Sequence, residues 1–492
     1  MFLGTGSDVG KSIVATAFCR IFKNEGFAVA PFKAQNMSNN SYVTLEGGEI
    51  GRAQATQAEA AGLLPSVHMN PILLKPTGEM GSQVVVCGQV YKNMTAKNYY
   101  KFKDEIKSQV IKSYQNLSQN YNCIVLKGAG SCCEVNLRKH DIVNFEMALS
   151  VNAPVIIVAD IDRGGVFAQI IGSMELISEQ EKNLVAGFII NKFRGDPDLF
   201  QDGIDFIEQK TKKPVLGLIP YYKDIHIDRE DSMSLDTSRK MNISNHSIKI
   251  AVIRLSHISN FTDIEALENE SDVSIHWLES PNSILNYDAI IIPGSKNVIF
   301  DLKHIEKLGW FKALHDYARK ERGLIVGICG GYQMLGKEVH DPKGIESSLK
   351  NSKGIGLLDV STEMDTIKVL KRSSGKDRLF KASVKGYEIH MGKTRLNNNV
   401  SPLIDLENGY SDGAISKNKM IFGSYLHGLF DSGLFRKNFL ECIAKKNNIE
   451  LVKDINYSDY WDFKEKNYEM LGEHFKKYSQ LERIINIILL HH

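Results

Sequence analysis

Short apolar runs that each end in polar residues recur through the first half of this chain and limit its fold more than any other feature. They are residues 1–3, 28–33, 123–126, 154–160, 186–190 and 215–220. Runs of this length, separated by segments that suit helices, are typical of buried parallel strands. The carboxyl ends of parallel strands meet at one edge of a sheet, where ligands bind. The pattern therefore predicts an N-terminal α/β domain with one active edge.

A glycine-rich loop follows the first of these runs, before a segment that suits a helix (residues 13–22). Backbone N–H groups of such a loop cradle phosphates, its lysine reaches the terminal phosphates, and the next hydroxyl holds Mg²⁺. We predict ATP binding by Thr5, Gly6, Ser7, Asp8, Val9, Gly10, Lys11 and Ser12, with Ser12 also as the Mg²⁺ ligand. The strict motif has glycine at the position of Thr5, and Gly4 stands one position further away. A glycine-rich turn without a ligand is the alternative, and the first strand is expected to be short.

Polar side chains gather at the same predicted sheet edge. Residues 34–41 form a polar loop after the second strand, and a polar turn follows the fourth strand. Solvated loop surface is the simpler interpretation, but the density of amides and charges favours a polar ligand. The predicted substrate-binding residues are Gln35, Asn36, Asn39 and Arg163.

The second half of the chain has a cysteine between a predicted strand and a predicted helix. Residues 324–326 are apolar and lead into Gly-Ile-Cys-Gly-Gly at residues 327–331. A nucleophile on such a turn stands clear of the backbone, and the N–H groups just after it can face an oxyanion. Far downstream, His427 ends a short strand beside Gly428 and is the candidate base for Cys329. A buried structural cysteine and a structural histidine are the alternatives.

The segments around Cys329 and His427 resemble the glutaminase domain of triad-type glutamine amidotransferases. The resemblance implies that Cys329 is the nucleophile and His427 its base, and that the Gly330 amide and the Gly294 loop form the oxyanion site. Commoner members carry a glutamate two residues after the histidine, where this chain has Leu429. This replacement points to the branch that works with a Cys–His pair.

Further segments extend the resemblance, and together they are similar to the cobyric acid synthase family along essentially the whole chain. They are residues 33–41, 159–167, 191–196, 256–263, 293–297 and 386–392. The loop spacing from Gly4 is similar to that of the dethiobiotin synthetase-like group. The resemblance implies amidation of the b, d, e and g carboxylates of an (adenosyl)cobyrinic acid a,c-diamide, with glutamine as nitrogen donor and with ATP and Mg²⁺ as cofactors. It also places Asn191 at the adenine.

One residue departs from the family pattern at the predicted phosphate site. The family has a glutamate at the position of Lys127, in a Glu-Gly-Ala-Gly-Ser run, where a carboxylate can serve Mg²⁺. A lysine cannot ligate a metal, and its ammonium group is expected near the point where Mg²⁺ and triphosphate charges meet. Lys127 could contact phosphate instead.

The expected fold class is α/β, with an N-terminal parallel-sheet P-loop-type synthetase domain before a class I-like glutamine amidotransferase domain and a C-terminal helical tail. The expected bounds are 1–233, a polar linker over 234–247, 248–445, and 446–492. Residues 346–353 and 371–376 are rich in Lys and Ser and are expected to be surface loops. The apolar face of residues 481–488 is expected to pack against the protein.

Composition adds few constraints on partners. The 60 Lys and Arg residues balance 58 Asp and Glu residues to a formal charge of +2, which gives no electrostatic argument for nucleic acid or membrane. No window approaches the ~18 apolar residues of a spanning helix, and no leader precedes the first motif, so a cytoplasmic enzyme is expected. The 7 cysteines lack the spacing of a disulfide framework or a zinc site. Small-molecule partners are expected, and homo-oligomerisation stays open.

Two other functions remain compatible with these patterns. A related corrin amidotransferase, such as cobyrinic acid a,c-diamide synthase, differs in the substrate that triggers ATP hydrolysis. A nucleotide-binding partner protein that resembles partitioning ATPases and has lost ligase chemistry is suggested by Lys127. That second function needs no reactivity at Cys329, so glutamine hydrolysis abolished by Cys329→Ala would argue against it.

Overall fold

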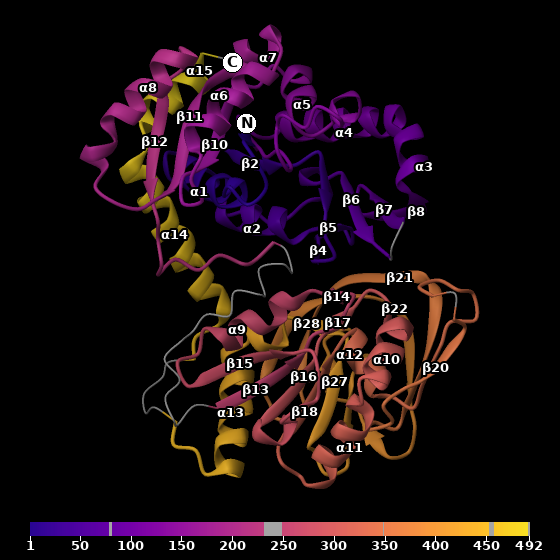
Figure 1. Ribbon diagram of the computed structural model, residues 1–492. Helices are drawn as coiled ribbons and strands as arrows, with labels where there is room; N and C mark the ends of the chain where they lie inside the picture. The colour runs from indigo at the N-terminus through magenta and orange to yellow at the C-terminus, as the bar shows by residue number, and fades with distance from the viewer. Residues whose placement is uncertain (78–80, 231–247, 348, 452–456, 491–492) are drawn as a thin grey trace.

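The computed structural model describes residues 1–77, 81–230, 248–347, 349–451 and 457–490. The chain forms two α/β halves, and the C-terminal helices run from the lower half back to the upper one (Figure 1). The predicted linker, residues 234–247, lies outside the described residues, as do His491 and His492. Within the described residues, no helix combines the length and apolar character that crossing a membrane requires.

The upper half is built on a parallel sheet, as the apolar runs predicted. Its strands are β1 (Phe2–Gly4), β2 (Val29–Phe32), β9 (Cys123–Leu126), β10 (Val155–Asp160), β11 (Val185–Phe193) and β12 (Val215–Pro220). β1, β10, β11 and β12 pair in that order, all in parallel. β2 pairs in parallel with β9, and a bridge between Phe2 and Lys127 places β9 beside β1. The glycine-rich loop and Lys127 therefore lie at the same edge of the sheet.

Helices alternate with these strands along the chain. They are α1 (Lys11–Asn24), α2 (Arg52–Ala60), α3 (Ala96–Lys101), α4 (Lys103–Ser118), α5 (Phe145–Ser150), α6 (Val166–Leu176), α7 (Glu179–Leu184) and α8 (Gln201–Thr211). In α1, Val14, Phe18 and Ile21 recur at helical spacing and are buried in the core of this half. That packing fixes the start of α1, and with it the glycine-rich loop, against the sheet.

A smaller sheet and a hairpin follow β2. β3 (Gln35–Met37) pairs in parallel with β6 (Ile72–Pro76), and β7 (Gly81–Val86) and β8 (Gln89–Thr95) extend that sheet with antiparallel pairs. β4 (Ser41–Val43) and β5 (Glu49–Gly51) form the hairpin. The prediction of a polar loop over residues 34–41 was wrong for β3, because its backbone pairs with β6 despite its polar side chains.

The lower half has a central sheet and a second, curved sheet beside it. The central strands, in spatial order, are β15 (Val273–Leu278), β13 (Ile248–Ile253), β16 (Ala289–Ile292), β18 (Leu324–Ile328), β27 (Ile421–Ser424), β26 (Ala414–Ser416) and β23 (Val400–Ser401). The second sheet holds β20 (Asn351–Lys353), β19 (Glu338–His340), β21 (Val360–Asp377), β22 (Ser383–Leu396) and β28 (Leu426–His427). The helices are α9 (Glu265–Glu268), α10 (Val298–Lys307), α11 (Trp310–Arg319), α12 (Gly330–Leu335) and α13 (Gly433–Asn447).

Both segments that were expected to be surface loops contain strand residues. Residues 371–376 lie inside β21, where they pair antiparallel with β22 from Lys371↔Glu388 to Lys376↔Ser383. Residues 351–353 form β20, which pairs with β19. The loop prediction failed because cross-strand pairing, which depends on a distant segment, overrode the low strand propensity of lysine and glycine.

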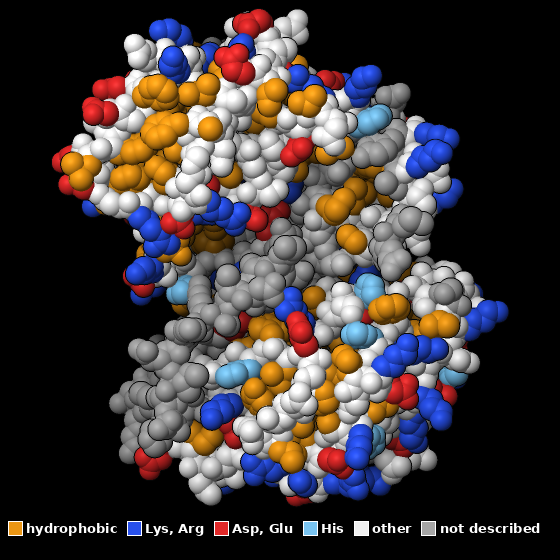
Figure 2. Space-filling model, in the orientation of Figure 1, with side chains coloured by type: hydrophobic (Ala, Val, Ile, Leu, Met, Phe, Trp, Pro, Cys, Tyr) orange, Lys and Arg blue, Asp and Glu red, His pale blue; other side chains and the backbone are white. Residues whose placement is uncertain are grey.

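The C-terminal helices α14 (Tyr460–Tyr478) and α15 (Leu481–Leu489) pack on the upper half. Arg20 of α1 is buried and donates to both carboxylate oxygens of Glu465 at 2.8 Å. Ile484 is buried in the same core, which confirms that this apolar face packs against the protein. Basic and acidic side chains are interspersed over the face of both halves shown in Figure 2.

Candidate active site

The nucleophile candidate stands on a strained turn between β18 and α12. Cys329 has φ 51° and ψ −107°, a backbone conformation that non-glycine residues rarely adopt. A Cβ atom at Gly331 would lie 1.9 Å from the Ile292 carbonyl oxygen, so the turn requires glycine there. This is the nucleophile elbow that the sequence predicted, and it aims the thiol of Cys329 across the end of the sheet.

A histidine and a carboxylate from other segments meet at this elbow. His427, in β28, is buried, and its Nδ1 lies 2.7 Å from Oδ2 of Asp263. The second oxygen of Asp263 accepts a hydrogen bond of 2.8 Å from the Gly428 N–H. His427 and Cys329 line the same small cavity, where the thiol lies 3.4 Å from the Ile389 carbonyl oxygen. With Nδ1 held by Asp263, Nε2 is the ring nitrogen that remains for proton transfer, and it lies 3.4 Å from Nδ2 of Asn260.

Asp263 decides the proton affinity of this histidine. Burial acts to lower the pKa of His427, but Asp263 and Cys329 outweigh it and raise the pKa to about 10. The raised pKa keeps the imidazole of His427 protonated in the cavity that Cys329 also lines. Cys329, His427 and Asp263 thus lie together at the elbow, and their roles in nucleophilic catalysis stay a prediction.

The sequence-based interpretation of a Cys–His pair missed this carboxylate. Leu429 is buried, and its apolar side chain carries no charge. Asp263 instead comes from a short 3-10 helix, Phe261–Ile264, that follows β14 (Ile258–Ser259). Asp263 does lie in one of the segments that carried the family resemblance. A polar residue shortly after a strand end was the available signal.

Of the two predicted oxyanion glycines, Gly330 follows Cys329 at the elbow and Gly294 lies in the short strand that packs against it. A Cβ atom at Gly330 would meet the Ser295 amide nitrogen at 2.7 Å. Gly294, in β17 (Gly294–Ser295), pairs with Ser259, and a Cβ atom there would lie 3.6 Å from Cε1 of His427. The structure thus brings both glycines to the elbow, and their role as oxyanion donors stays a prediction.

The upper half reaches into this site through the β4–β5 hairpin. The Ser41 N–H donates a hydrogen bond of 2.9 Å to Asn260, whose Nδ2 lies 3.4 Å from Nε2 of His427. Tyr42 packs edge-on against Tyr387 with ring centroids 4.7 Å apart, and Tyr387 stacks on His427 at 5.2 Å. The two halves therefore share the surroundings of the histidine.

The Asp263–His427 pair makes stability depend on pH in a defined window. In the folded protein His427 keeps its proton up to about pH 10, whereas its ordinary pKa is 6.5. The folded state therefore binds more protons between these values, so the stabilisation is complete below pH 6.5 and is lost as the pH rises towards 10. We expect Asp263→Asn to lower the Tm by several degrees at pH 6.5, and the two Tm values to converge as the pH rises. Thermal unfolding of both proteins between pH 6.5 and 10 measures this difference in Tm. A difference that does not change with pH would contradict the raised pKa of His427.

In the upper half, the side chain of Lys11 connects the glycine-rich loop to the segment after β9. Lys11 is buried, and its Nζ donates to the carbonyl oxygens of Gly6 at 2.6 Å and Gly130 at 2.7 Å. Burial lowers the pKa of Lys11 to about 8. Asn191 is buried and donates to the Val9 carbonyl at 3.1 Å, and its place at the adenine stays a prediction. The amide nitrogen of Asn191 therefore stabilises the glycine-rich loop through this hydrogen bond.

Replacing Gly10 should weaken nucleotide binding. Gly10 has φ 101°, and a Cβ atom there would lie 2.1 Å from Nδ2 of Asn191. A left-handed conformation costs an L-residue roughly 1–2 kcal/mol, so Gly10→Ala should reduce ATP affinity about ten-fold or more. Gly26→Ala is the matched control, because Gly26 has φ 87° but open space around its Cα. Calorimetric titration with ATP compares the two variants, and equal affinities would contradict this role of Gly10.

The predicted Mg²⁺ position beside Ser12 is taken by an ammonium group. Nζ of Lys127 lies 2.5 Å from Oγ of Ser12 and 2.6 Å from Oε2 of Glu230, and Ser12 also bonds to Glu230. Nζ of Lys33 lies 3.2 Å from the same carboxylate. Burial lowers the pKa of Lys127 to about 7, against the effect of Glu230, whose own pKa is held well below its usual range by the two lysines. These residues do not fit a magnesium ion held by Ser12.

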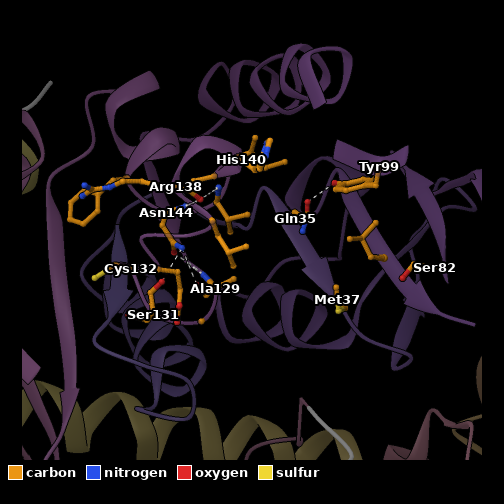
Figure 3. A pocket seen from close by; sticks show the side chains of 18 of the residues that line it. Gln35, Met37, Ser82, Tyr99, Ala129, Ser131, Cys132, Arg138, His140 and Asn144 are labelled. Carbon is orange, nitrogen blue, oxygen red and sulfur yellow. Dashed lines mark hydrogen bonds between the residues drawn. The ribbon is translucent and has the colours of Figure 1, made fainter. Parts of the chain in front are cut away.

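A cavity of about 610 Å³ lies next to this loop. It is lined by the small sheet on one side and by the segment after β9 on the other (Figure 3). Gln35 lines it and accepts a hydrogen bond from the Tyr99 hydroxyl. Gly130 also lines it, and its carbonyl oxygen binds Lys11. The cavity and the phosphate loop therefore share a wall.

The other predicted substrate residues are not part of this wall. Asn36 is buried and bonds to Nζ of Lys33 at 2.5 Å and to Gln54 at 3.1 Å. Asn39 is half-buried, and Arg163 is exposed on the turn after β10. Sequence reasoning missed Arg138 and Asn144, which line the cavity. They lie in the polar segment after β9, and their position beyond the carboxyl end of a parallel strand is the sequence signal that points to ligand binding.

Comparison with known proteins matches both halves. Residues 1–235 match a family described as the CobQ/CobB/MinD/ParA nucleotide binding domain, and residues 249–435 match the CobB/CobQ-like glutamine amidotransferase domain. A cobyric acid synthase of Syntrophobacter fumaroxidans is 44% identical over 99% of this chain and 98% of its own length. Those of Clostridium novyi and Chlorobium phaeobacteroides are 44% and 46% identical, each over 99% of this chain and over 97% and 98% of their own lengths.

Proposed function

This chain belongs to the cobyric acid synthase family of glutamine-dependent carbon–nitrogen ligases in cobalamin biosynthesis, and from that premise we propose its reaction. It amidates the b, d, e and g carboxylates of (adenosyl)cobyrinic acid a,c-diamide, with ATP as the activating co-substrate and glutamine as the source of nitrogen. One observation carries the proposal: Gly130 both lines the large cavity and binds Lys11 of the phosphate loop. A carboxylate in the cavity would lie beside the phosphates.

The lower half would release ammonia from glutamine. The Cys329 thiolate attacks the side-chain amide carbon, and the amide nitrogen leaves as ammonia with the proton that Nε2 of His427 donates. Water then hydrolyses the thioester to glutamate and restores the thiol. Asp263 holds the imidazole in the orientation and charge state that both steps need, and N–H groups near Gly330 and Gly294 would stabilise the oxyanion.

The upper half would use that ammonia to make the amide. A carboxylate is a poor acyl donor, so its oxygen first attacks the γ-phosphorus of ATP, which gives an acyl phosphate and ADP. Ammonia attacks the acyl carbon, the bond from that carbon to the phosphate oxygen breaks, and the proton that nitrogen loses leaves with the phosphate as hydrogen phosphate. Lys11 and the N–H groups of residues 6–12 would hold the phosphates. Asn191 would stabilise the loop, and its Oδ1, which has no partner among the described residues, stays available to the nucleotide.

The cavity suits part of a corrin better than a whole one. Its walls combine apolar side chains such as Met37 and Leu74 with polar groups such as Gln35 and Arg138. Apolar surface can cover the face of a macrocycle, and the polar groups can bind a carboxylate or amide arm. Because its volume is about 610 Å³, we propose that it receives one edge of the corrin at a time.

Magnesium would reach this reaction as the counter-ion that ATP carries in solution. Ser12 offers it no free oxygen, because Lys127 and Glu230 engage the hydroxyl. Glu230 is the nearest carboxylate, and it is paired with Lys127 and Lys33. We therefore assign no reaction step to a metal ion held by the protein.

The substrate that triggers ATP hydrolysis tests this function against its nearest alternative. We expect phosphate release to rise when the a,c-diamide of cobyrinic acid is added with glutamine, and to stay at background with cobyrinic acid itself. The opposite preference would identify a cobyrinic acid a,c-diamide synthase. No stimulation by either corrin, with ATP still bound, would favour a nucleotide-binding protein that has lost ligase chemistry.

A further inference from the structure

The phosphate site contains a buried cluster of charges that the proposed function does not use. Lys127 donates to both carboxylate oxygens of Glu230, at 2.9 and 2.6 Å, and to Oγ of Ser12 at 2.5 Å. Lys127 is 2% exposed and Lys33 is 5% exposed. These contacts form at the carboxyl end of β9, directly behind the glycine-rich loop. The cluster therefore belongs to the nucleotide site and cannot be a surface ion pair.

The ammonium group occupies the position that a loop of this type gives to a metal ion. In such loops the hydroxyl after the lysine and a nearby carboxylate are the oxygens that ligate Mg²⁺. Here Ser12 and Glu230 are those groups, and Nζ of Lys127 is bonded to both. An ammonium and a divalent cation repel each other and compete for the same oxygens, so both cannot occupy this point at once.

Lys127 is also held where it is. Its backbone N–H donates to the Phe32 carbonyl at 2.9 Å, and a bridge to Phe2 continues the parallel sheet. Turning its side chain away would move the buried ammonium from the Glu230 carboxylate and the Ser12 hydroxyl, and a buried charge that loses its partners is costly. The ammonium is therefore a fixed part of the site.

The second carboxylate at this edge is also neutralised by a lysine. Asp160, at the end of β10, is buried, and its Oδ2 lies 2.7 Å from Nζ of Lys192. The same Nζ donates to the Asp8 carbonyl oxygen of the loop at 2.7 Å. Glu230 and Asp160 are thus both paired with an ammonium group, which lowers their attraction for a divalent cation.

We propose that the Lys127 ammonium replaces the protein-bound magnesium ion, so that the site binds nucleotide triphosphate without needing a divalent cation. Three ammonium groups, those of Lys11, Lys33 and Lys127, then face the phosphates against the carboxylate of Glu230. Lysine binds phosphate as a point charge, so this set can neutralise a triphosphate as a lysine and a metal ion do elsewhere. The inference rests on the proposed ATP site and adds its cation requirement.

Equilibrium binding tests this inference on the intact protein. ATP is titrated calorimetrically in excess EDTA and in excess Mg²⁺. For the unaltered protein we expect dissociation constants that agree within about three-fold, a difference well under 1 kcal/mol. A loss of affinity of ten-fold or more in EDTA would overturn the proposal. This comparison needs no variant, so a folding defect cannot obscure it.

A variant then assigns the effect to the ammonium group. Lys127→Gln removes the charge and frees Ser12 and Glu230, so we expect its ATP affinity to fall at least ten-fold in EDTA and to recover with Mg²⁺. Lys210→Gln, at an exposed lysine of α8, is the matched control and should behave as the unaltered protein. Equal affinities of Lys127→Gln in EDTA and Mg²⁺ would overturn the role of Lys127.

The failure of this inference can be told apart from the failure of the proposed function. Magnesium-dependent ATP binding together with corrin amidation would overturn the inference that Lys127 replaces magnesium, and it would leave the proposed ligase function intact. ATP binding without magnesium, but no amidation, would support the inference and reject the ligase function. No binding of ATP under either condition would overturn both.

Discussion

The Cys329→Ala variant is expected to lose glutamine-dependent amidation by a factor of at least about 10³ while ammonia-dependent amidation stays near the wild-type rate. The thiol forms the covalent bond that releases ammonia, and no other side chain at the elbow can replace it. The acyl phosphate forms in the other half of the molecule and accepts free ammonia. Amide formation is measured with glutamine and, separately, with ammonium chloride at alkaline pH.

The two nitrogen sources make this result interpretable. The elbow is strained at residue 329, with φ 51°, and alanine tolerates that conformation as poorly as cysteine does, so stability should change little. A loss of both activities would mean that the substitution disturbs the whole protein. Retention of glutamine-dependent activity would refute Cys329 as the nucleophile.

The Asp263→Asn variant is expected to lower the glutamine-dependent rate by a factor on the order of 10²–10⁴, again without effect on the ammonia-dependent rate. Asparagine keeps the shape of the side chain but not the negative charge that stabilises the imidazolium of His427, 2.7 Å away. It can also present its amide nitrogen to Nδ1 and so favour the wrong tautomer. Steady-state glutamate release measures the effect.

A purely structural role for Asp263 predicts a different outcome. The rate profile against pH should shift to lower pH in Asp263→Asn, because the pKa of His427 is no longer raised by the carboxylate. Asp316→Asn, a partly exposed carboxylate of α11 paired with Arg319, is the control and should match wild type. An equal fall in the glutamine-dependent and ammonia-dependent rates, or an unchanged pH profile, would contradict a catalytic role for Asp263.

The parts of the site that the sequence predicted are those in which the chemistry is local. The loop over residues 4–12 and the turn at Cys329 are contiguous, so glycine spacing and a neighbouring apolar strand reveal them. The parallel sheet of the upper half could be predicted as well, because apolar strands separated by helices place their carboxyl ends at one edge. Lys127, which follows β9, lies at that edge.

The parts that the sequence did not predict depend on contacts between distant segments. Asp263 reaches His427 across 164 positions, and Glu230 reaches Ser12 across 218 positions. A lone carboxylate after a strand has no spacing that marks its partner. The same reason explains residues 371–376, whose composition suggested a loop until pairing with β22 made them a strand. Tertiary pairing, which propensity does not contain, decided each case.

The most direct test of the central claim follows nitrogen from glutamine to the corrin. The protein is incubated with ATP, adenosylcobyrinic acid a,c-diamide and glutamine labelled with a heavy isotope at the amide nitrogen, and the corrin is analysed by mass spectrometry over time. We predict stepwise conversion of four carboxylates to amides, each carrying the label, and no conversion without ATP. Unlabelled product, or a corrin that stays unchanged while ATP and glutamine are both hydrolysed, would contradict the account.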